Sequence, residues 1–305
     1  MIEYYKKNGG DRDVIKSKSL IPSSWIKVVD PTEKDIKFLV NQLGLDKSQL
    51  MDGLDLYETP RLEEDNGALY IFLRAPTSNI LNESTSSFLL IVSKNNVITV
   101  SKEDLEIFNK LLDSKSFTTS RASRFVMHTL FYVSRQFSFE VRKLLKQVKR
   151  EKRKLLGLHD KDLLSLVSQE DTLNDYLSSF APLIDMHNKI LKIKSLRFGE
   201  VEKDFIEDLI IDLSQTFNTS KSALKTISNM RDYYSVALSN RINKTITVLT
   251  IFTVFLTIPT LISSIYGMNI SLPFQYAPQI LWFLGGIVLM IWAILFLLFK
   301  KGKLF

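Results

Sequence analysis

The stretch ITVLTIFTVFLTIPTLISSI, residues 246–265, contains twenty consecutive residues without a charge, and Tyr266-Gly267-Met268-Asn269 follows it directly. A second charge-free stretch of twenty residues runs from Ile280 to Phe299. Because an α-helix rises about 1.5 Å per residue, each stretch is long enough to cross a hydrocarbon core of about 30 Å. The sequence therefore predicts a membrane protein that ends in a helical hairpin.

The charges around the hairpin predict its orientation. The loop Tyr266–Gln279 has no charge of either sign. In contrast, basic residues lie before the first stretch and after the second, namely Arg241, Lys244, Lys300, Lys301 and Lys303. Since cytoplasmic segments carry an excess of Lys and Arg, we expect a multi-pass protein of the plasma membrane with both termini in the cytoplasm. Residues 1–14 are charged and lack an apolar run, so no signal peptide is expected.

Composition limits the remaining possibilities. The chain has 305 residues, a net charge of +7 and no cysteine, which excludes disulfides and thiolate metal sites and agrees with a reducing compartment. With about sixty residues in the membrane, about 240 remain for a soluble part large enough to bury its own core. The basic balance by itself suits nucleic acid or an anionic membrane surface as a partner.

The first 120 residues have the pattern of a mixed α/β domain. Residues 30–33, Asp-Pro-Thr-Glu, predict a helix that ends at about Leu43, with Asp30 as its N-cap, Pro31 at its first position and Glu33 completing a capping box. Strands are predicted at Ser24–Val29, Ala68–Arg74, Ser87–Val92 and Asn96–Ser101. The turn Lys94-Asn95-Asn96 favours a hairpin between the last two strands.

Helical periodicity dominates after about Thr118. We expect helices over Arg121–Gly157, Lys161–Leu196 and Val201–Ile265, with breaks at Gly157 and Gly199. An unbroken last helix of 65 residues would be about 97 Å long, so most of it would project below the membrane. The expected class is α+β, with a cytoplasmic α/β domain at 1–120, a helical stalk at 121–245 and a transmembrane hairpin with a basic tail at 246–305.

A polar stripe runs along the last predicted helix. Counting back from Ser264 in alternating steps of four and three residues gives seventeen positions, of which only three are apolar. They are Ser264, Thr260, Thr257, Thr253, Thr250, Ile246, Asn243, Ser239, Val236, Asp232, Asn229, Lys225, Ser222, Asn218, Gln215, Ile211 and Asp208. A repeated seven-residue step favours supercoiling of several copies about a shared axis.

Two interpretations of the stripe remain open from the residues alone. In the stalk it can be a solvated helix face, and in the membrane each threonine can bond back to its own helix. Five hydroxyl side chains on one helix face within an apolar stretch nevertheless favour the lining of a pore. Hydroxyls in a bilayer are stabilised when they face protein or water instead of lipid.

These residues resemble the CorA family of divalent-cation channels. Tyr266-Gly267-Met268-Asn269, at the outer end of the first of two C-terminal spans, is similar to the family signature, and Ser239–Asn243 through Asn269 resembles its pore helix. Trp25–Pro31, Pro60-Arg61 and the strand from Ala68 resemble its cytoplasmic domain. The similarity extends over the chain from about Ser24.

The resemblance implies a funnel-shaped homopentamer in the lipid bilayer, with the first spans around the pore. It also implies passive uptake of Mg²⁺, and of Co²⁺ or Ni²⁺, driven by the membrane potential and gated by intracellular Mg²⁺, without an organic cofactor. Gly267, Met268 and Asn269 then form the outer entrance, where Asn269 holds a hydrated ion. Mg²⁺ loses its water reluctantly, so amide oxygens suit recognition through the waters.

Matching positions imply further pore residues. Asn243 corresponds to the cytoplasmic constriction, Ile246 and Leu249 to the hydrophobic gate, and Thr257 and Thr260 to the upper pore. Relatives often carry methionine at the position of Thr257, and Pro259 is shifted by one residue, so a wetter upper pore is expected. The full predicted lining is Asn243, Ile246, Leu249, Thr250, Thr253, Thr257, Thr260 and Ser264.

A regulatory Mg²⁺ site between subunits is implied at Asp208. The usual acidic partner aligns near Ser78, which offers no charge, and Glu83 is the nearest carboxylate. The resemblance therefore leaves this second site incomplete.

The segment Arg142 to Lys154 departs from relatives that are acidic there. Eight basic residues are opposed only by Glu140 and Glu151, namely Arg142, Lys143, Lys146, Lys149, Arg150, Lys152, Arg153 and Lys154. Such a run can be a solvated helix face, or a surface that attracts anionic headgroups or nucleic acid.

Other functions are less consistent with the sequence. An enzyme is not expected, because the chain has only three histidines, interpreted as surface or packing residues, and no His-Glu-x-x-His or phosphate loop. A zinc transporter of the same architecture, with or without proton coupling, is the nearest alternative, although Met268 favours magnesium and cobalt. A membrane-anchored nucleic-acid-binding protein is the distant alternative, and no nucleic acid partner is expected.

Overall fold

The computed structural model describes the chain except residues 10–12, 78–83, 115, 154–159, 274–276 and 302–305. Two compact units are present, Met1–Arg231 and Asp232–Phe305, and each is described by itself. Their boundary falls inside one continuous helix, α6 (Glu200–Tyr266). The division at residues 120 and 245 expected from the sequence stays a prediction.

A seven-stranded sheet organises the first unit, in the order β2-β1-β3-β7-β6-β5-β4. The strands β3 and β7 run parallel, with Ile26 opposite Ile98, and every other pair is antiparallel. The bounds are β1 Ile2–Lys6, β2 Ile15–Ser17, β3 Trp25–Val29, β4 Arg61–Asp65, β5 Ala68–Pro76, β6 Thr85–Val92 and β7 Val97–Ser101. The four predicted strands and the hairpin between β6 and β7 are confirmed, whereas β1, β2 and β4 were not predicted.

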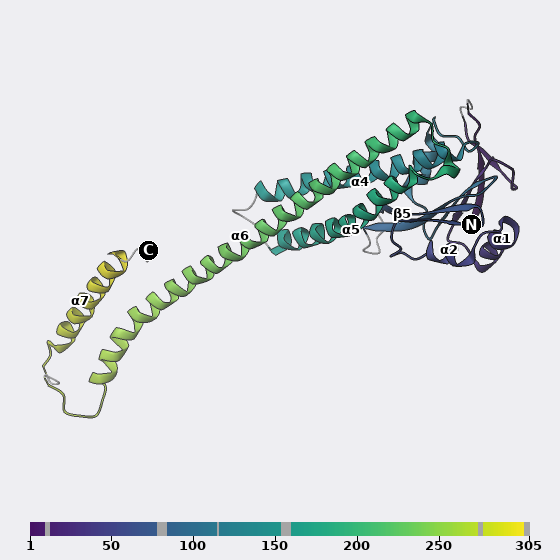
Figure 1. Cartoon of the computed structure of the whole chain (residues 1–305). Helices are drawn as coiled ribbons and strands as arrows, with labels where there is room; N and C mark the ends of the chain where they lie inside the picture. Colours follow the sequence, from purple (N-terminus) through teal and green to yellow (C-terminus); the bar gives the residue numbers. More distant parts are fainter. Residues whose placement is uncertain (10–12, 78–83, 115, 154–159, 274–276, 302–305) are drawn as a thin grey trace. The chain divides into compact units, whose positions relative to one another are not determined.

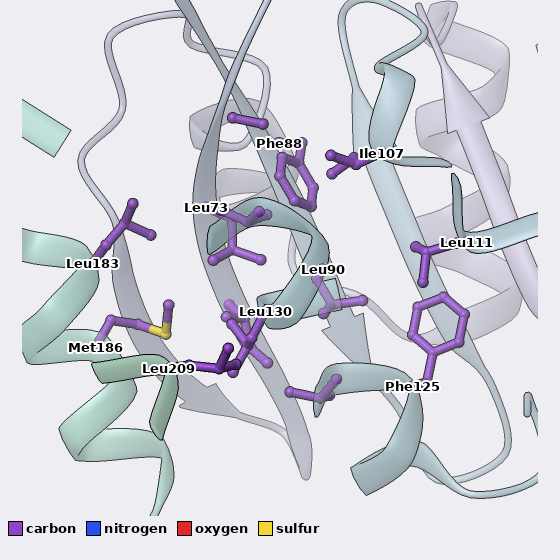
Figure 2. Close-up of a cluster of buried hydrophobic side chains, with 14 of the residues drawn as sticks. Leu73, Phe88, Leu90, Ile107, Leu111, Phe125, Leu130, Leu183, Met186 and Leu209 are labelled. Carbon is purple, nitrogen blue, oxygen red and sulfur yellow. The ribbon is translucent and has the colours of Figure 1, made fainter. Parts of the chain in front are cut away.

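The sheet has helices on both faces because its central strands are apolar on both sides (Figure 1). Along β5, Tyr70 and Phe72 enter the core under α1 (Glu33–Leu43) and α2 (Lys47–Asp52), whereas Ile71 and Leu73 enter the opposite core. That second core includes α3 (Glu106–Asp113) and parts of α4 (Ala122–Arg153), α5 (Asp160–Ile190) and α6. Figure 2 shows side chains of the sheet meeting Leu130 of α4 and Leu209 of α6.

The start of α1 differs from the prediction. Thr32, not Asp30, is the N-cap, and a reciprocal capping box joins Thr32 to Asp35 instead of Glu33. Asp30 has a left-handed backbone with φ 45°, which ends the preceding strand and excludes it from the helix. The helix ends at Leu43 as predicted, and Gly44 follows in the left-handed conformation with φ 67°.

Three long helices follow the sheet. They are α4 (Ala122–Arg153), α5 (Asp160–Ile190) and α6, and the predicted break at Gly157 lies outside the described residues. The second helix ends earlier than expected, since a short 3-10 turn at Lys194–Leu196 replaces its last residues. Gly199 precedes α6, and its amide donates to Glu202 Oε2 over 3.1 Å, which caps the new helix.

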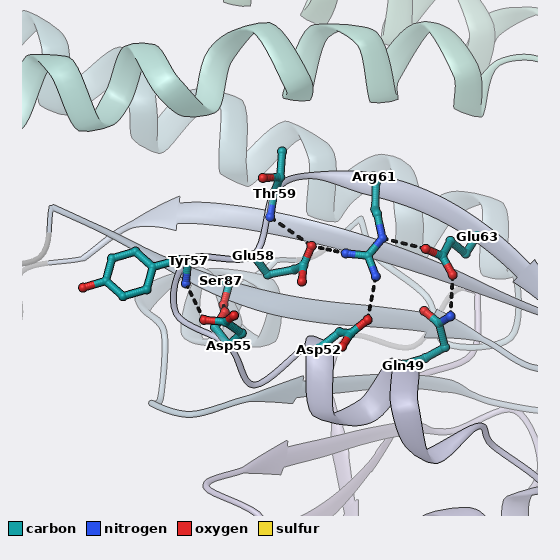
Figure 3. A network of polar contacts seen from close by, with 9 residues as sticks. All are labelled: Gln49, Asp52, Asp55, Tyr57, Glu58, Thr59, Arg61, Glu63 and Ser87. Atoms are coloured by element: carbon teal, nitrogen blue, oxygen red, sulfur yellow. Dashed lines mark hydrogen bonds and ion pairs between the residues drawn. The ribbon is translucent and has the colours of Figure 1, made fainter.

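An arginine network ties α2 to the edge of the sheet (Figure 3). Arg61 on β4 donates to Asp52 over 2.8 Å, to Glu63 over 2.6 Å and also to Glu58. Its guanidinium carbon lies 3.8 Å from the centre of the Phe72 ring. The hydrogen bond from Arg61 lowers the pKa of Glu63, so the network connects a charged edge strand to the apolar core.

The second unit contains the end of α6 and the helix α7 (Ile280–Lys301). Both helices include segments long and apolar enough to cross a membrane, which agrees with the predicted hairpin. The Trp292 indole donates to the carbonyl of Phe255 over 3.0 Å, and their ring centres are 5.6 Å apart. These contacts pack α7 against one face of α6.

Candidate functional site

One face of α6 remains uncovered along nearly its whole length. All seventeen positions of the polar stripe between Asp208 and Ser264 are exposed. Within the first unit, the opposite face of α6 is buried in the core and contributes Ile206, Leu209, Leu213, Ala223, Ile227 and Met230. The stripe is therefore a side of the helix that the other described residues leave exposed.

In the second unit, α7 covers the face of α6 that lies away from the threonines. Phe255 and Ile262 are half-buried, whereas Thr253, Thr257, Thr260 and Ser264 are exposed. Helical geometry of about 100° per residue explains this division, because residues 255 and 262 lie nearly opposite residues 257 and 260. The exposed face consequently combines the hydroxyls with large aliphatic side chains, of which Leu249 is 65% and Leu261 is 59% exposed.

The threonine hydroxyls bond back to their own helix. Thr250, Thr253, Thr257 and Thr260 each donate to the carbonyl four residues earlier, over 2.7 to 2.9 Å. This is the local bonding that the sequence left open as an alternative to pore lining. The two are compatible, because a hydroxyl has one hydrogen to donate and keeps two lone pairs that can accept from water.

The tetrapeptide Tyr266-Gly267-Met268-Asn269 begins at the last residue of α6 and continues as a tight turn. The Gly267 amide donates to the Ser263 carbonyl over 2.9 Å, and the Met268 amide donates to Ile265 over 3.2 Å. A Cβ at Gly267 would lie 3.1 Å from the Ser263 carbonyl oxygen and 3.6 Å from that of Ser264. Glycine is thus favoured here by close approach of backbone atoms, since its φ is not left-handed.

Met268 and Asn269 are exposed beyond this turn, with Met268 half accessible. An amide side chain at Asn269 presents one carbonyl oxygen and one NH₂ group to the surroundings. A neutral oxygen of this kind can accept hydrogen bonds from the water shell of a cation without removing the shell. The chemistry at the end of α6 therefore suits a hydrated ion.

At the other end of the apolar stretch, large apolar residues share the uncovered face with an amide. Ile246 and Leu249 are 55% and 65% exposed, and Asn243 is exposed one turn before them. Aliphatic side chains that are exposed to this extent beside a polar stripe are available for contact with lipid or with further protein.

Asp208 is exposed on the same face of α6 as the stripe. Ser78 and Glu83, the positions considered as its partners, lie outside the described residues. Within the described part of the chain, no group of three or more His, Asp or Glu residues is arranged to hold a metal ion. A metal site at Asp208 is therefore not completed by the described residues of one chain.

Two features were not found from the sequence. A cavity of about 490 Å³ lies beside the start of α6, where the half-exposed Arg121 and Arg124 lie 3.6 and 3.5 Å from the carboxylate of Glu202. His187 is fully buried on α5, its Nδ1 bonds to the Leu183 carbonyl over 2.7 Å, and burial lowers its pKa to about 4. The burial of His187 agrees with the expected packing role, and no periodic signal marks either feature.

Comparison with known proteins adds an independent observation. A family model described as "CorA-like Mg2+ transporter protein" matches residues 23–301. The cobalt/magnesium transport protein CorA of Methanocaldococcus jannaschii is 28% identical over 91% of this chain and 90% of its own length. The magnesium transport protein CorA of Campylobacter jejuni is 24% identical over 92% of this chain and 91% of its own length.

A solved structure has the same fold over almost the whole chain. The complete structure of the CorA magnesium transporter from Methanocaldococcus jannaschii superimposes with a TM-score of 0.84 and 23% identity. The match covers 99% of this chain and 98% of that structure. At this identity the match concerns the arrangement of the α/β domain, the long helix and the two apolar helices.

Proposed function

The chain belongs to the CorA-like Mg²⁺ transporter family, and from this premise we propose how it carries divalent cations across the membrane. The chain takes up divalent cations, with Mg²⁺ as the main substrate and Co²⁺ or Ni²⁺ as further ones. The route is a channel formed by the α6 helices of a homopentamer. Residues 1–120 and 121–245 form its cytoplasmic domain and stalk, and residues 246–305 form its membrane hairpin.

The uncovered stripe on α6 is the observation that carries this proposal. Seventeen positions spaced by three and four residues are all exposed, and fourteen of them are polar. A stripe with a mean period of 3.5 residues stays in register with identical neighbours when the helices supercoil. Five copies would bring the threonines around one axis and leave α7 on the outside.

The outer entrance is assigned to Gly267, Met268 and Asn269. Five Asn269 side chains would receive the ion with its water shell, because Mg²⁺ dehydrates reluctantly. Below them, the hydroxyls of Thr260, Thr257, Thr253 and Thr250 donate to their own helix and keep their lone pairs free. These lone pairs can accept from the waters of the passing ion, so the back-bonded rotamer supports conduction of a hydrated cation.

The gate is assigned to the cytoplasmic end of the apolar stretch. Ile246 and Leu249, repeated five times, form a constriction that closes by losing water, with Asn243 next to it. Intracellular Mg²⁺ bound near Asp208 would hold neighbouring subunits together and favour the closed state, since a carboxylate is a ligand that Mg²⁺ prefers. Falling intracellular Mg²⁺ then releases the gate.

The membrane potential drives uptake in this proposal. Both termini are cytoplasmic, so ions enter at Asn269 and leave at the stalk. A divalent ion gains about 4.6 kcal/mol per 100 mV on entering a negative interior, which makes uptake favourable without a chemical energy source. No organic cofactor is required.

Cysteine accessibility in open channels tests the pore assignment. Because the chain has no native cysteine, Thr257→Cys and Thr260→Cys can be labelled without background. We expect a small water-soluble thiol reagent to modify both and to reduce Mg²⁺ flux. The matched controls Phe255→Cys and Ile262→Cys lie on the half-buried face and should remain unmodified. Equal reactivity at 255 and 257 would refute the pore lining and favour threonines that serve only their own helix.

A further inference from the structure

The C-terminal part of α4 presents one strongly basic face, here called the basic surface. It consists of Arg142, Lys143, Lys146, Lys149, Arg150 and Lys152, all of which are exposed. The opposite face of this part of α4 is apolar, and Val141 and Val148 are buried in the cores. The helix is therefore amphipathic, with its charges directed away from the protein core.

Little in the described structure neutralises the basic surface. Lys143 pairs with Glu140 over 3.2 Å, and it is the one member of the surface with an ion pair among the described residues. The other acidic residue of this segment, Glu151, is turned away from solvent. Its Oε1 accepts from Ser165 Oγ over 2.8 Å and from Gln169 Nε2 over 2.9 Å. Among the described residues, five positive charges of the basic surface thus have no ion-pair partner.

Apolar side chains are exposed on α5, the helix that contacts this end of α4. The hydrogen bond between Glu151 and Ser165 brings the start of α5 next to the end of α4, as Figure 1 also shows. On this part of α5, Leu164 is 71% exposed and Val167 is 40% exposed. Exposed Lys and Arg next to exposed aliphatic residues are the combination that binds to a membrane interface.

We propose that the basic surface binds the anionic headgroups of the membrane that holds the chain, and that Leu164 and Val167 enter the headgroup region. Positive charges on exposed side chains attract an anionic leaflet within about one Debye length, and the attraction weakens with salt. The same chain is inserted in that membrane through its apolar helices, so the headgroups are present at a high effective concentration. This favours lipid over nucleic acid as the partner.

A fluorescence experiment on the full chain tests this contact. Gln147 is exposed between the basic residues, and Gln147→Cys provides a single labelling site. The labelled protein is placed in nanodiscs of phosphatidylcholine, with or without about one-third phosphatidylglycerol and with nitroxide-labelled headgroups. We expect at least about twofold stronger quenching with phosphatidylglycerol, and loss of this difference in about 0.5 M NaCl.

Two charge variants separate the proposed contact from general attraction. Lys146→Gln, Lys149→Gln, Arg150→Gln and Lys152→Gln together should abolish the dependence on phosphatidylglycerol. Lys34→Gln, Lys37→Gln, Lys47→Gln and Lys102→Gln remove the same charge from exposed positions elsewhere and should retain it. Circular dichroism verifies that both variants keep their helices.

Three results would overturn the proposal. One is equal quenching in neutral and anionic discs, and another is an unchanged lipid dependence after the four substitutions on α4. The third is displacement of the label from phosphatidylglycerol by added duplex RNA or DNA at equal phosphate concentration, which would make nucleic acid the partner. Weaker quenching after Leu164→Gln and Val167→Gln, with the remaining quenching still sensitive to salt, would support entry of the aliphatic residues into the interface.

Discussion

Replacing Gly267 with alanine should reduce cation flux through a contact that the structure defines. The new Cβ would lie 3.1 Å from the Ser263 carbonyl oxygen, several tenths of an ångström inside ordinary van der Waals contact. The carbonyl cannot move freely, because it also accepts the amide of residue 267 over 2.9 Å. Overpacking of this kind costs about 1 to 3 kcal/mol.

The expected size of the effect follows from that strain. If the backbone relieves it by displacing Met268 and Asn269, the population with the native entrance falls about tenfold for each 1.4 kcal/mol. We therefore expect Mg²⁺ flux in liposomes to fall by about fivefold to about 100-fold per channel. Assembly should persist, because the contact is confined to the end of α6.

Gly285→Ala is the matched control for this experiment. Gly285 lies inside α7, and a Cβ there would meet nothing within 4 Å. Alanine should be neutral or slightly stabilising at this position, since it is the better helix former by about 1 kcal/mol. Equal flux in the two variants, at equal amounts of assembled protein, would refute the argument that close packing at residue 267 holds the entrance.

Three further predictions concern the first unit, Met1–Arg231. Asp208→Ala should weaken inhibition by Mg²⁺ on the cytoplasmic side. The control Asp212→Ala removes another exposed carboxylate one turn later and should leave the inhibition unchanged. Identical inhibition curves for the two variants would exclude a role for Asp208. His187 has a pKa of about 4 in the folded protein and of about 6.5 in the unfolded chain. Its contribution to the free energy of unfolding is therefore present above pH 6.5 and is lost as the pH falls toward 4, by about 2 kcal/mol between pH 7 and pH 5. Thermal unfolding should therefore be less sensitive to this pH range in His187→Leu, and an unchanged pH dependence would contradict the assignment. Arg61→Ala removes the cation over Phe72 and leaves three carboxylates together. The free energy of unfolding should therefore fall by about 1 to 3 kcal/mol, which a lower melting temperature would report. The control Lys110→Ala should have a smaller effect, because its exposed pair with Glu106 contributes about 0.5 kcal/mol.

The parts of the fold that the sequence predicts are those with uninterrupted apolar patterns. The strands β5, β6 and β7 are buried on both faces and read as continuous apolar runs, as does the hairpin of α6 and α7. In contrast, β4 reads Arg-Leu-Glu-Glu-Asp, because it pairs on one side only and uses its charges in the Arg61 network. A composition of this kind resembles a loop.

Local alternatives also limit prediction from sequence. The start of α1 offers two overlapping capping boxes, and the backbone of Asp30, with φ 45°, selects the one that begins at Thr32. For the candidate site, spacing alone identified the stripe on α6 and its exposed positions. Spacing could not identify the close approach at Gly267 or the rotamers of the threonines, because both depend on the three-dimensional course of the helix backbone.

Mg²⁺ influx into liposomes that contain Asn269→Ala tests the central claim most directly. Wild-type protein under an inside-negative potential should transport Mg²⁺, and the variant should assemble normally but conduct little, because it lacks the amide that receives the hydrated ion. Flux through correctly assembled Asn269→Ala equal to that of the wild type would contradict the assignment of the entrance and of the ion path along α6.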